Sequence, residues 1–499
     1  EVRRAGERVR IGPSSADLKR EGDALSLAIV PHPAAKVAGT PLTVRARARF
    51  QPGPIELELS GGPVTLSALG VEEGSFGLRG VQEALIEAET KLVLAPGGEV
   101  ELKGRGRLSR ARLYRKAISS SEISGIDVGW RGAATGRLDG SRFTVSDAEL
   151  AMGEVRATVS GELERSSERT YFKIGASVPA VACASLYEAL PQGMAPLLAG
   201  IALDGTFAIS VSAEYDSKKP SATRTKLELA NRCRVVTVPP AISPRRFRNS
   251  WLREVKGPDG QPMAIESGPG SADWTPYEDI SPNLETAVTI SEDGGFFRHR
   301  GFDARALESA LRDNLIAGRY LRGASTISMQ LAKNLYLGSE KTISRKLQEA
   351  VLVVLLEQEL SKHELMELYL NVIEYGPGIY GVKRAARHYF DEEPSELSLG
   401  QALYLSSILP KPDSSHFRPD GALSERWAAY LRKLMQIART RNRITDEELE
   451  AGLAEEIRFR VPSAGAASPD SGPTGALGDS TNYEDEPPRE LERAAHGGP

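Results

Sequence analysis

Cysteine is scarce in this sequence of 499 residues, which excludes a small disulfide-rich fold. The two cysteines, Cys183 and Cys233, leave open either one bridge or two buried thiols. The sequence also lacks a cluster of His and Cys at the spacing of zinc ligands. With 40% hydrophobic and 26% charged residues, the chain has the composition of a folded globular protein.

Long apolar runs and a strong net charge are absent as well. The longest apolar run, Ala350 to Leu356, is far shorter than the roughly 20 residues that cross a bilayer. The formal net charge of −4 gives no global field that would attract nucleic acid, so we expect no nucleic-acid partner. The sequence begins at Glu1 without an initiator Met, and we expect a signal peptide or membrane anchor upstream.

The length is too great for one core and predicts two or three domains. Shifts in composition predict a multidomain α+β protein. We expect a β-rich domain over 1–237, a linker over 238–280, a mainly α domain over 281–460 and a disordered tail over 461–499.

Apolar and polar residues alternate with a period of two through the β-rich region. Residues 1 to about 30 are charged, and we expect them to be irregular. One helical interruption is expected at Cys183 to Leu190. The strands are expected at 42–50, 55–59, 90–94, 99–102, 143–145, 155–163, 206–213 and 223–229. These alternating strands weakly resemble the AsmA-like repeats of bacterial envelope proteins. The alternative is an antiparallel sandwich that serves as a spacer or partner surface.

The α region contains two carboxylates with features of catalytic acids. Glu292 ends an apolar-periodic run and precedes Gly294-Gly295, which places it at a helix end where the backbone turns into a cleft. Glu349 lies four residues after Arg345 on another predicted helix. Either Arg345 and Glu349 form an ordinary salt bridge, or Glu349 is a second acid that lines the same cleft. A weak hydroxyl nucleophile needs such a base.

Cations and hydroxyls are grouped near these acids. Ser325, Met329 and Lys333 are four residues apart and share one face of a helix predicted to begin after Gly323. Four cations follow along this stretch: Lys333, Lys341, Arg345 and Lys346. Together they could hold a pyrophosphate through charge-assisted hydrogen bonds, whereas the alternative is a solvated helix surface.

Five ordered blocks between Trp274 and Arg439 extend this pattern. They are Glu292-Asp293-x-x-Phe296-x-x-His299-x-Gly301, Gly323-x-Ser325-Thr326-Ile327 through Lys333-Asn334, Arg345-Lys346-x-x-Glu349, Tyr369-Leu370-Asn371 through Tyr389-Phe390, and Leu397-Ser398 through Pro410. This arrangement resembles the family-51 peptidoglycan glycosyltransferases, and most closely the monofunctional biosynthetic transglycosylases.

The resemblance implies a lysozyme-like domain that polymerises lipid II into glycan strands and releases undecaprenyl pyrophosphate. Glu292 matches the general base and Glu349 the second glutamate, which assists departure of the leaving group directly or through Mg²⁺ or Mn²⁺. The substrate-contacting set would be Asp293, Phe296, His299, Ser325, Thr326, Gln330, Lys333, Asn334, Lys341, Arg345 and Lys346. The expected partners are lipid II, the nascent glycan strand, the membrane surface and other cell-wall synthesis proteins.

The implied location is the periplasmic face of the bacterial inner membrane. In this family the segment corresponding to Phe302–Leu321 dips into the membrane surface, although an ordinary amphipathic core helix would show the same pattern. Met329 replaces a usual glutamine and Lys341 a usual arginine, and both changes would weaken donor binding. The sequence contains no Ser-x-x-Lys, so we expect no transpeptidase activity.

Two other functions fit parts of the sequence. A lytic muramidase would share the lysozyme-like shape and the catalytic carboxylic acid, but would not need the cations. A non-catalytic envelope scaffold would bind lipid or protein through the β-rich domain, and the substitutions Met329 and Lys341 are its support.

Overall fold

The computed structural model describes residues 2–4, 7–9, 14–31, 40–412 and 416–460. The chain forms two compact units. The first contains residues 1–240, 304–320 and 339–348, and the second contains 241–303, 321–338 and the chain from 349 onward. The first is built on a large sheet and the second mainly on helices, which confirms the α+β class. The predicted disordered tail, 461–499, lies outside the described residues.

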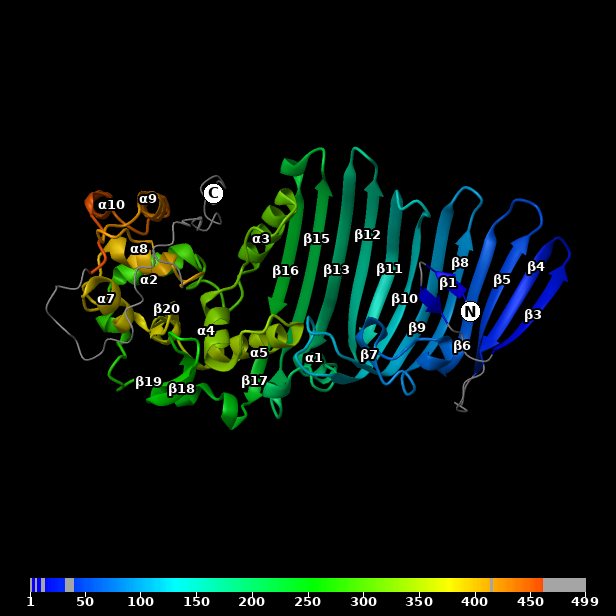
Figure 1. Cartoon of the computed structure of the whole chain (residues 1–499), viewed down its shortest axis with the longest axis horizontal. Helices are drawn as coiled ribbons and strands as arrows, with labels where there is room; N and C mark the ends of the chain where they lie inside the picture. The colour runs from blue at the N-terminus through cyan, green and yellow to red at the C-terminus, as the bar shows by residue number, and fades with distance from the viewer. Residues whose placement is uncertain (1, 5–6, 10–13, 32–39, 413–415, 461–499) are drawn as a thin grey trace. The chain divides into compact units, whose positions relative to one another are not determined.

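A 13-stranded antiparallel sheet dominates the first unit (Figure 1). Strands that are neighbours in the sheet are nearly always neighbours in sequence. From one edge to the other, the strands are β3 (Ser14–Glu21), β4 (Ala24–Pro31), β5 (Thr40–Arg49), β6 (Ile55–Thr65), β8 (Leu85–Leu94), β9 (Glu99–Leu113), β10 (Ile123–Arg137), β11 (Arg142–Met152), β12 (Val155–Arg165), β13 (Thr170–Ala182), β15 (Thr206–Asp216) and β16 (Arg224–Asn231), with β7 (Leu78–Arg79) paired to β9.

Two expectations for this region are wrong. Residues 14–31 are not irregular but form the hairpin of β3 and β4, because Leu25, Leu27 and Ile29 alternate along β4 and pair in register with β5. The long strands also join one sheet instead of the two packed sheets of a sandwich. All the predicted strand positions do lie within observed strands, apart from one or two residues at their ends.

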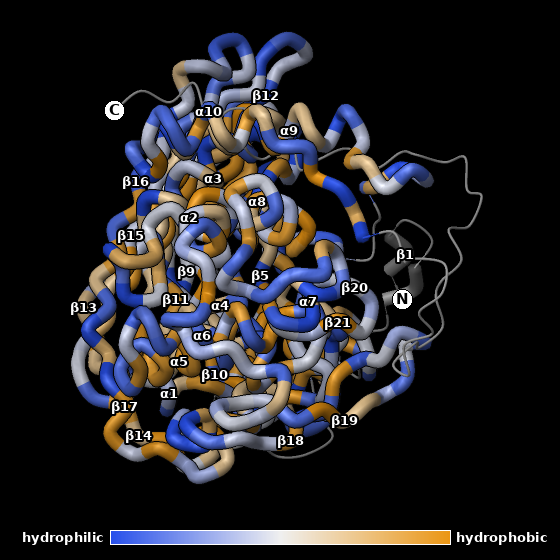
Figure 2. Tube along the Cα trace, turned by 90° about the vertical axis from the view of Figure 1, so that its left-hand side faces the viewer, coloured by the Kyte–Doolittle hydropathy of each residue, from blue (hydrophilic) through white to orange (hydrophobic). Residues whose placement is uncertain are grey.

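Hydropathy alternates along the strands, so the tube of the sheet changes between hydrophilic and hydrophobic colours (Figure 2). A small core forms where the connection after β6 returns over the sheet, with Leu66, Val81 and Ala84 packed near Ile86 and Leu108. The expected helical interruption is confirmed as α1 (Cys183–Glu188). The cysteines form one disulfide, Cys183–Cys233.

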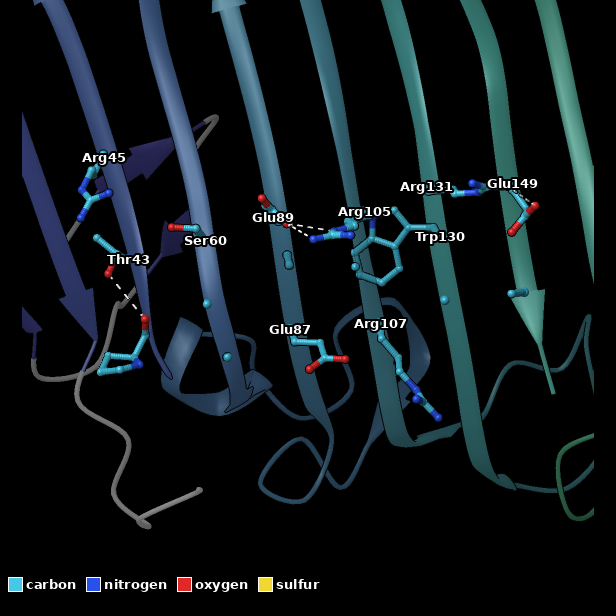
Figure 3. A pocket seen from close by; sticks show the side chains of 17 residues that line it. Thr43, Arg45, Ser60, Glu87, Glu89, Arg105, Arg107, Trp130, Arg131 and Glu149 are labelled. Carbon is cyan, nitrogen blue, oxygen red and sulfur yellow. Dashed lines mark hydrogen bonds and ion pairs between the residues drawn. The ribbon is translucent and has the colours of Figure 1, made fainter. Parts of the chain in front are cut away.

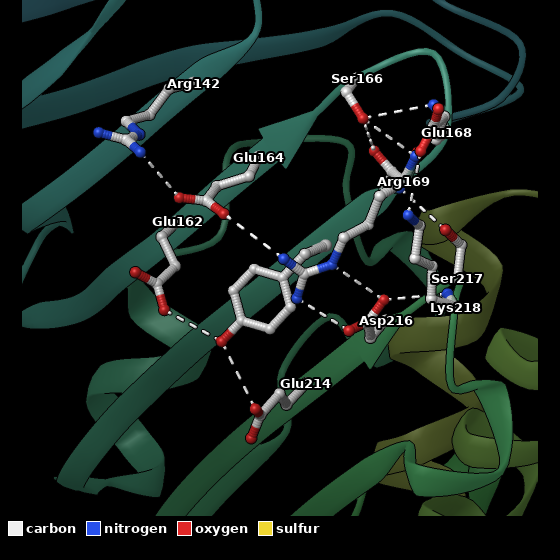
Figure 4. Close-up of polar contacts among 12 residues, drawn as sticks. Arg142, Glu162, Glu164, Ser166, Glu168, Arg169, Glu214, Asp216, Ser217 and Lys218 are labelled. Atoms are coloured by element: carbon white, nitrogen blue, oxygen red, sulfur yellow. Dashed lines mark hydrogen bonds and ion pairs between the residues drawn. The ribbon is translucent and has the colours of Figure 1, made fainter.

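One face of the sheet carries paired charges. Across adjacent strands, Arg105 lies 2.6 Å from Glu89 and Arg131 lies 2.8 Å from Glu149, along a trough of about 760 Å³ (Figure 3). Near the strand ends, Arg169 lies 2.8 Å from Asp216 in a further network of ion pairs (Figure 4). This pairing leaves the charged face largely self-neutralised and suited to water.

The second unit is a helical domain with two short hairpins. Its helix α2 packs mainly against the buried α8 and has a fully buried side at Leu284, Ala287 and Val288. Its elements are β18 (Trp251–Lys256), β19 (Pro262–Ser267), α2 (Pro282–Ser291), α4 (Ile327–Tyr336), α6 (Lys362–Val372), β20 (Glu374–Gly376), β21 (Ile379–Tyr380), α7 (Val382–Phe390), α8 (Leu399–Ser407), α9 (Glu425–Thr440) and α10 (Asp446–Ala454).

The predicted linker does not remain without structure. Residues 251–267 form the β18–β19 hairpin, because the Pro and Gly residues cluster at its turn while Trp251, Arg253 and Val255 alternate along the strand. Residues 241–280 therefore belong to the second unit, and the boundaries differ from the predicted ones.

The segment 304–359 adds two further α-helices, and two small hairpin-like pairs join β1 (Val2–Arg4) to β2 (Glu7–Val9) and β14 (Ala202–Asp204) to β17 (Arg234–Thr237). Helix α3 (Ala304–Ala317) belongs to the first unit and lies along β16 (Figure 1). The division between the units falls within α5 (Ile343–Glu359), after Gln348. Among the described helices, none combines the length and apolar character needed to span a bilayer.

Candidate active site

Glu292 stands at the C-terminal end of α2, as predicted, where its backbone N–H still donates to Val288. The side chain is half-buried, and its Oε2 accepts a hydrogen bond of 2.8 Å from Nε2 of Gln330 on α4. Oε1 of the same amide accepts a hydrogen bond of 2.9 Å from the hydroxyl of Tyr369 on α6. Three helices thus fix one carboxylate through a chain of two hydrogen bonds.

Tyr369 acts as a donor in this chain because its hydroxyl stays protonated. Burial raises the pKa of Tyr369 well above its usual value, and the nearby carboxylate of Glu292 raises it further. The donated proton selects one orientation of the Gln330 amide, with the carbonyl toward Tyr369 and the NH₂ toward Glu292. The reversed amide would place its oxygen against the carboxylate, which is unfavourable.

Asp293, the next residue, is buried and joins three segments. Its carboxylate accepts hydrogen bonds from the ring of His299 at 2.9 Å and from the backbone N–H of Ile327, at the start of α4, at 3.0 Å. The other ring nitrogen of His299 accepts from the N–H of Gly301. These contacts position the turn after Glu292, and substrate contact by Asp293 and His299 stays a prediction.

Helix α4 begins later than predicted. Thr326 is its N-cap and accepts from the N–H of Met329, while its own hydroxyl donates to the carbonyl of Gly301 at 2.7 Å. Ser325 therefore precedes the helix and is exposed instead of sharing a helical face with Met329 and Lys333. Met329 is buried, whereas Lys333 is exposed. The capping hydroxyl of Thr326 explains where the helix starts.

The remaining candidate residues lie on α4 and around α5. On α4, Asn334 is exposed and donates to the carbonyl of Gln330 at 2.9 Å. The cations Lys341, Arg345 and Lys346 belong to the first unit. Buried Glu349 belongs to the second unit, one helical turn after Arg345. A shared groove for Glu292, Glu349 and the cations stays a prediction.

A second cluster of side chains, around Phe296, was not predicted from the sequence. The Phe296 ring is buried, and the ammonium of Lys362 lies over it at 4.3 Å from the centroid. The same ammonium lies 2.7 Å from Glu357, which also accepts from the hydroxyl of Ser328. A capping box begins at Ser361, but nothing in its sequence marks the neighbouring lysine as the partner of a phenylalanine 66 positions earlier.

The Tyr369-Leu370-Asn371 block has a clear positioning function. Asn371 accepts from the N–H of Thr275 at 2.9 Å and donates to the carbonyl of the same residue at 2.8 Å. Gly381, at φ +87°, leaves room for the nearby Asn371 carbonyl, which would lie 2.8 Å from an added Cβ. The block therefore holds the segment before α2 in place.

Asp293, His299 and Asp303 lie close enough together to suggest a metal site. The first two do not fit a cation as placed, because both ring nitrogens of His299 and both oxygens of Asp293 already have hydrogen-bond partners. Mg²⁺ or Mn²⁺ bound elsewhere, with the substrate phosphates, stays a prediction.

Part of the sequence is similar to known proteins of one family. A family model described as transglycosylase matches residues 259–435. A biosynthetic peptidoglycan transglycosylase of Alcanivorax borkumensis is 43% identical over 176 residues, which are 35% of this chain and 72% of that protein. Similar proteins of Nitrosomonas eutropha and Chromobacterium violaceum are each 50% identical over 139 residues, which are 28% of this chain and 57% and 61% of those proteins. Residues 1–258, with every strand of the large sheet, lie outside the family match.

Proposed function

Because the chain belongs to the family of peptidoglycan transglycosylases and is a glycosyltransferase, we propose that it joins lipid II units into glycan strands with Glu292 as the general base. The observation that carries this assignment is the hydrogen-bonded chain from Tyr369 through Gln330 to Glu292. A base that must act on one hydroxyl needs a fixed position, and this chain supplies it.

In the proposed reaction, Glu292 takes the proton of the acceptor's GlcNAc 4-hydroxyl. The oxygen forms a bond to C1 of the donor's MurNAc, while the bond from C1 to the pyrophosphate breaks and the leaving group takes the electron pair. The amide of Gln330 donates to Glu292 and so favours its ionised form, which is the form that accepts a proton.

The leaving group needs fixed positive charge. Lys333 is exposed on α4, the helix that also carries Gln330, and it suits contact with the donor phosphates. Arg345 and Lys346 on α5, with Lys341 before it, would add further charge, and Glu349 would assist departure of undecaprenyl pyrophosphate. A lysozyme-like fold of the helical unit belongs to the same proposal.

We place the enzyme at the periplasmic face of the inner membrane, where its lipid-linked substrate would be found. The Cys183–Cys233 disulfide supports an oxidising compartment. The proposed activity does not include peptide cross-linking, since the acyl-serine motif Ser-x-x-Lys is absent from the sequence.

Incubation of the full chain with lipid II and Mg²⁺ tests the base. Glu292→Gln keeps the side-chain volume but removes the proton acceptor, so polymerisation should fall by about 10²–10⁴-fold. The control is Glu278→Gln, an exposed carboxylate near the start of the same unit, which should retain activity. Equal product from wild type and Glu292→Gln would refute the assignment.

A further inference from the structure

The face of the large sheet opposite the paired charges is apolar from one edge to the other. Register places one residue of each strand in a row that crosses the sheet, here called the apolar row. It consists of Leu18, Leu27, Ala46, Leu57, Leu92, Leu102, Ala134, Val145, Gly161, Ile174, Ala213 and Thr225. Not one of these residues is charged, and a single hydroxyl is present.

A second row, displaced by one residue along each strand, lies on the opposite face of the sheet and is mostly polar or charged. It consists of Lys19, Ser26, Arg47, Glu56, Val93, Glu101, Thr135, Thr144, Glu162, Lys173, Glu214 and Arg224. This second row belongs to the face with paired charges. Burial against a binding partner is therefore favourable for the apolar row, because it removes apolar surface from water.

The apolar row is accessible. Leu102 is 41% exposed and Ile174 is 51% exposed, and on the same face Leu150 is 51% exposed. At the spacing of neighbouring strands, twelve strands give the row a length of about 50 Å. A contiguous exposed apolar surface that crosses a whole sheet is of the kind that often marks a binding surface.

The chemistry of the row favours a hydrocarbon chain as the occupant. Backbone N–H and C=O groups along it pair with neighbouring strands, and its side chains offer almost no hydrogen bonds. A protein partner usually forms about one hydrogen bond per 100–200 Å² of interface, whereas a lipid tail needs none. A membrane-binding surface usually adds basic residues that face anionic headgroups, and here the charges lie on the opposite face.

The row ends at an element of the family-matched segment. At its last residue, the hydroxyl of Thr225 donates to the carbonyl of Glu308 on α3, and the carboxylate of Glu308 accepts from the N–H of Leu227 at 3.1 Å. Helix α3 lies within residues 259–435, which match the transglycosylase model, yet it packs on this sheet. The apolar row and part of the transglycosylase sequence thus form one continuous structure (Figure 1).

We propose that the apolar row binds the polyprenyl tail of the lipid-linked substrate, so that the sheet is a lipid-binding surface that ends at α3. The proposal rests on the proposed function, because that function supplies a substrate with a polyprenyl tail. The sheet then keeps the tail out of water.

The test uses the full chain and cis-parinaric acid, a polyene fatty acid whose fluorescence rises in an apolar environment. Wild type should bind the probe, and undecaprenyl phosphate should displace it, whereas the much shorter farnesyl phosphate should displace it poorly. Leu102→Glu with Val159→Glu places two charges on the apolar face, where both side chains are partly exposed, and should weaken binding about tenfold or more, which corresponds to about 1.4 kcal/mol.

The matched control is Lys103→Glu with Ser160→Glu, which adds glutamates at the next positions of the same strands on the charged face. It should bind within about twofold of wild type. Circular dichroism and thermal melting establish that both double variants fold. Equal binding by the two double variants overturns the proposal, as does a wild type that fails to bind the probe or keeps it in the presence of undecaprenyl phosphate. If wild type fails to bind the probe but does bind vesicles of phosphatidylglycerol, the apolar face contacts a membrane surface instead.

Glu292→Gln separates this proposal from the proposed function. It should lose polymerisation but keep wild-type displacement by undecaprenyl phosphate. If Glu292→Gln polymerises normally, the base assignment fails while the tail-binding proposal is still decided by displacement. If displacement fails while Glu292→Gln is inactive, the tail-binding proposal fails alone.

Discussion

At the scale of residues, the candidate site depends on a few side chains that act through one another. Gln330 has its two amide atoms bonded to Glu292 and Tyr369, and its contact with the substrate stays a prediction. That makes it a positioning residue for the proposed base. The tyrosine is fully buried and lies outside reach of solvent.

Tyr369→Phe tests this positioning function. The change removes the donor that orients the Gln330 amide, so kcat should fall about tenfold, which corresponds to about 1.4 kcal/mol and to the usual range for one hydrogen bond. The acidic limb of the pH–rate profile should also move to higher pH, because a less well oriented amide stabilises ionised Glu292 less. The KM for lipid II should change little.

Tyr375→Phe is the control, since Tyr375 is equally buried but its hydroxyl bonds to the carbonyl of Leu370. It should lower stability without moving the acidic limb. If the two variants give the same pH–rate profile, Tyr369 has only a packing function.

Residues of this kind show how far the sequence could predict the site. The position of Glu292 at a helix end follows from the apolar period before it and the glycines after it. Its contact with Gln330, 38 positions away, depends on how α2, α4 and α6 pack, and no local pattern reports that. Asp293 could be recognised as part of a motif but not as the partner of an α4 amide.

At the scale of elements, helix α6 anchors the segment that leads into α2. Asn371 makes two hydrogen bonds to the backbone of Thr275 and a third to the carbonyl of Glu367. These groups are buried, so each loses a partner that water cannot replace if the amide is removed.

Asn371→Ala should therefore destabilise the helical unit by about 2–4 kcal/mol, because two backbone groups of Thr275 are left unpaired. Trp274 is adjacent and buried, so its fluorescence during urea unfolding reports the change. Asn249→Ala, at an exposed position, is the comparison and should shift the midpoint little. A midpoint for Asn371→Ala equal to that of wild type would contradict the anchoring function.

The strands show which elements a pattern can reveal. β5 was predicted almost to its ends because apolar and basic residues alternate strictly along it. β10 (Ile123–Arg137) was not predicted, and Gly129, Gly132 and Gly136, which pair within the sheet, interrupt the alternation of its sequence. At Gly132 an added Cβ would lie 2.8 Å from Ala148, so close packing and not a turn explains the glycine.

At the scale of the whole molecule, the chain consists of two compact units, only one of which contains the disulfide. Two units of different architecture need not unfold together. The Cys183–Cys233 bond has a sequence separation of 50 and ties two connections of the sheet unit.

Replacing both cysteines by serine should lower the stability of the sheet unit by up to about 4 kcal/mol, since the bond restricts a long loop of the unfolded chain. Urea unfolding followed by circular dichroism should show two transitions, of which only the sheet transition moves. Tryptophan emission, dominated by Trp251, Trp274 and Trp427 of the helical unit, should keep its midpoint. Reductant should reproduce the shift in wild type and add nothing in the serine variant; a shift of both transitions would mean that the units unfold as one.

The order of the strands has a consequence for how such a chain can change during evolution. Almost every strand pairs with its immediate neighbours in sequence, so duplication or loss of one hairpin would leave the other pairings intact. The span of the sheet is therefore adjustable in steps of two strands, or roughly 10 Å. A gene could match that span to a longer or shorter ligand without changing the sequence of the helical unit.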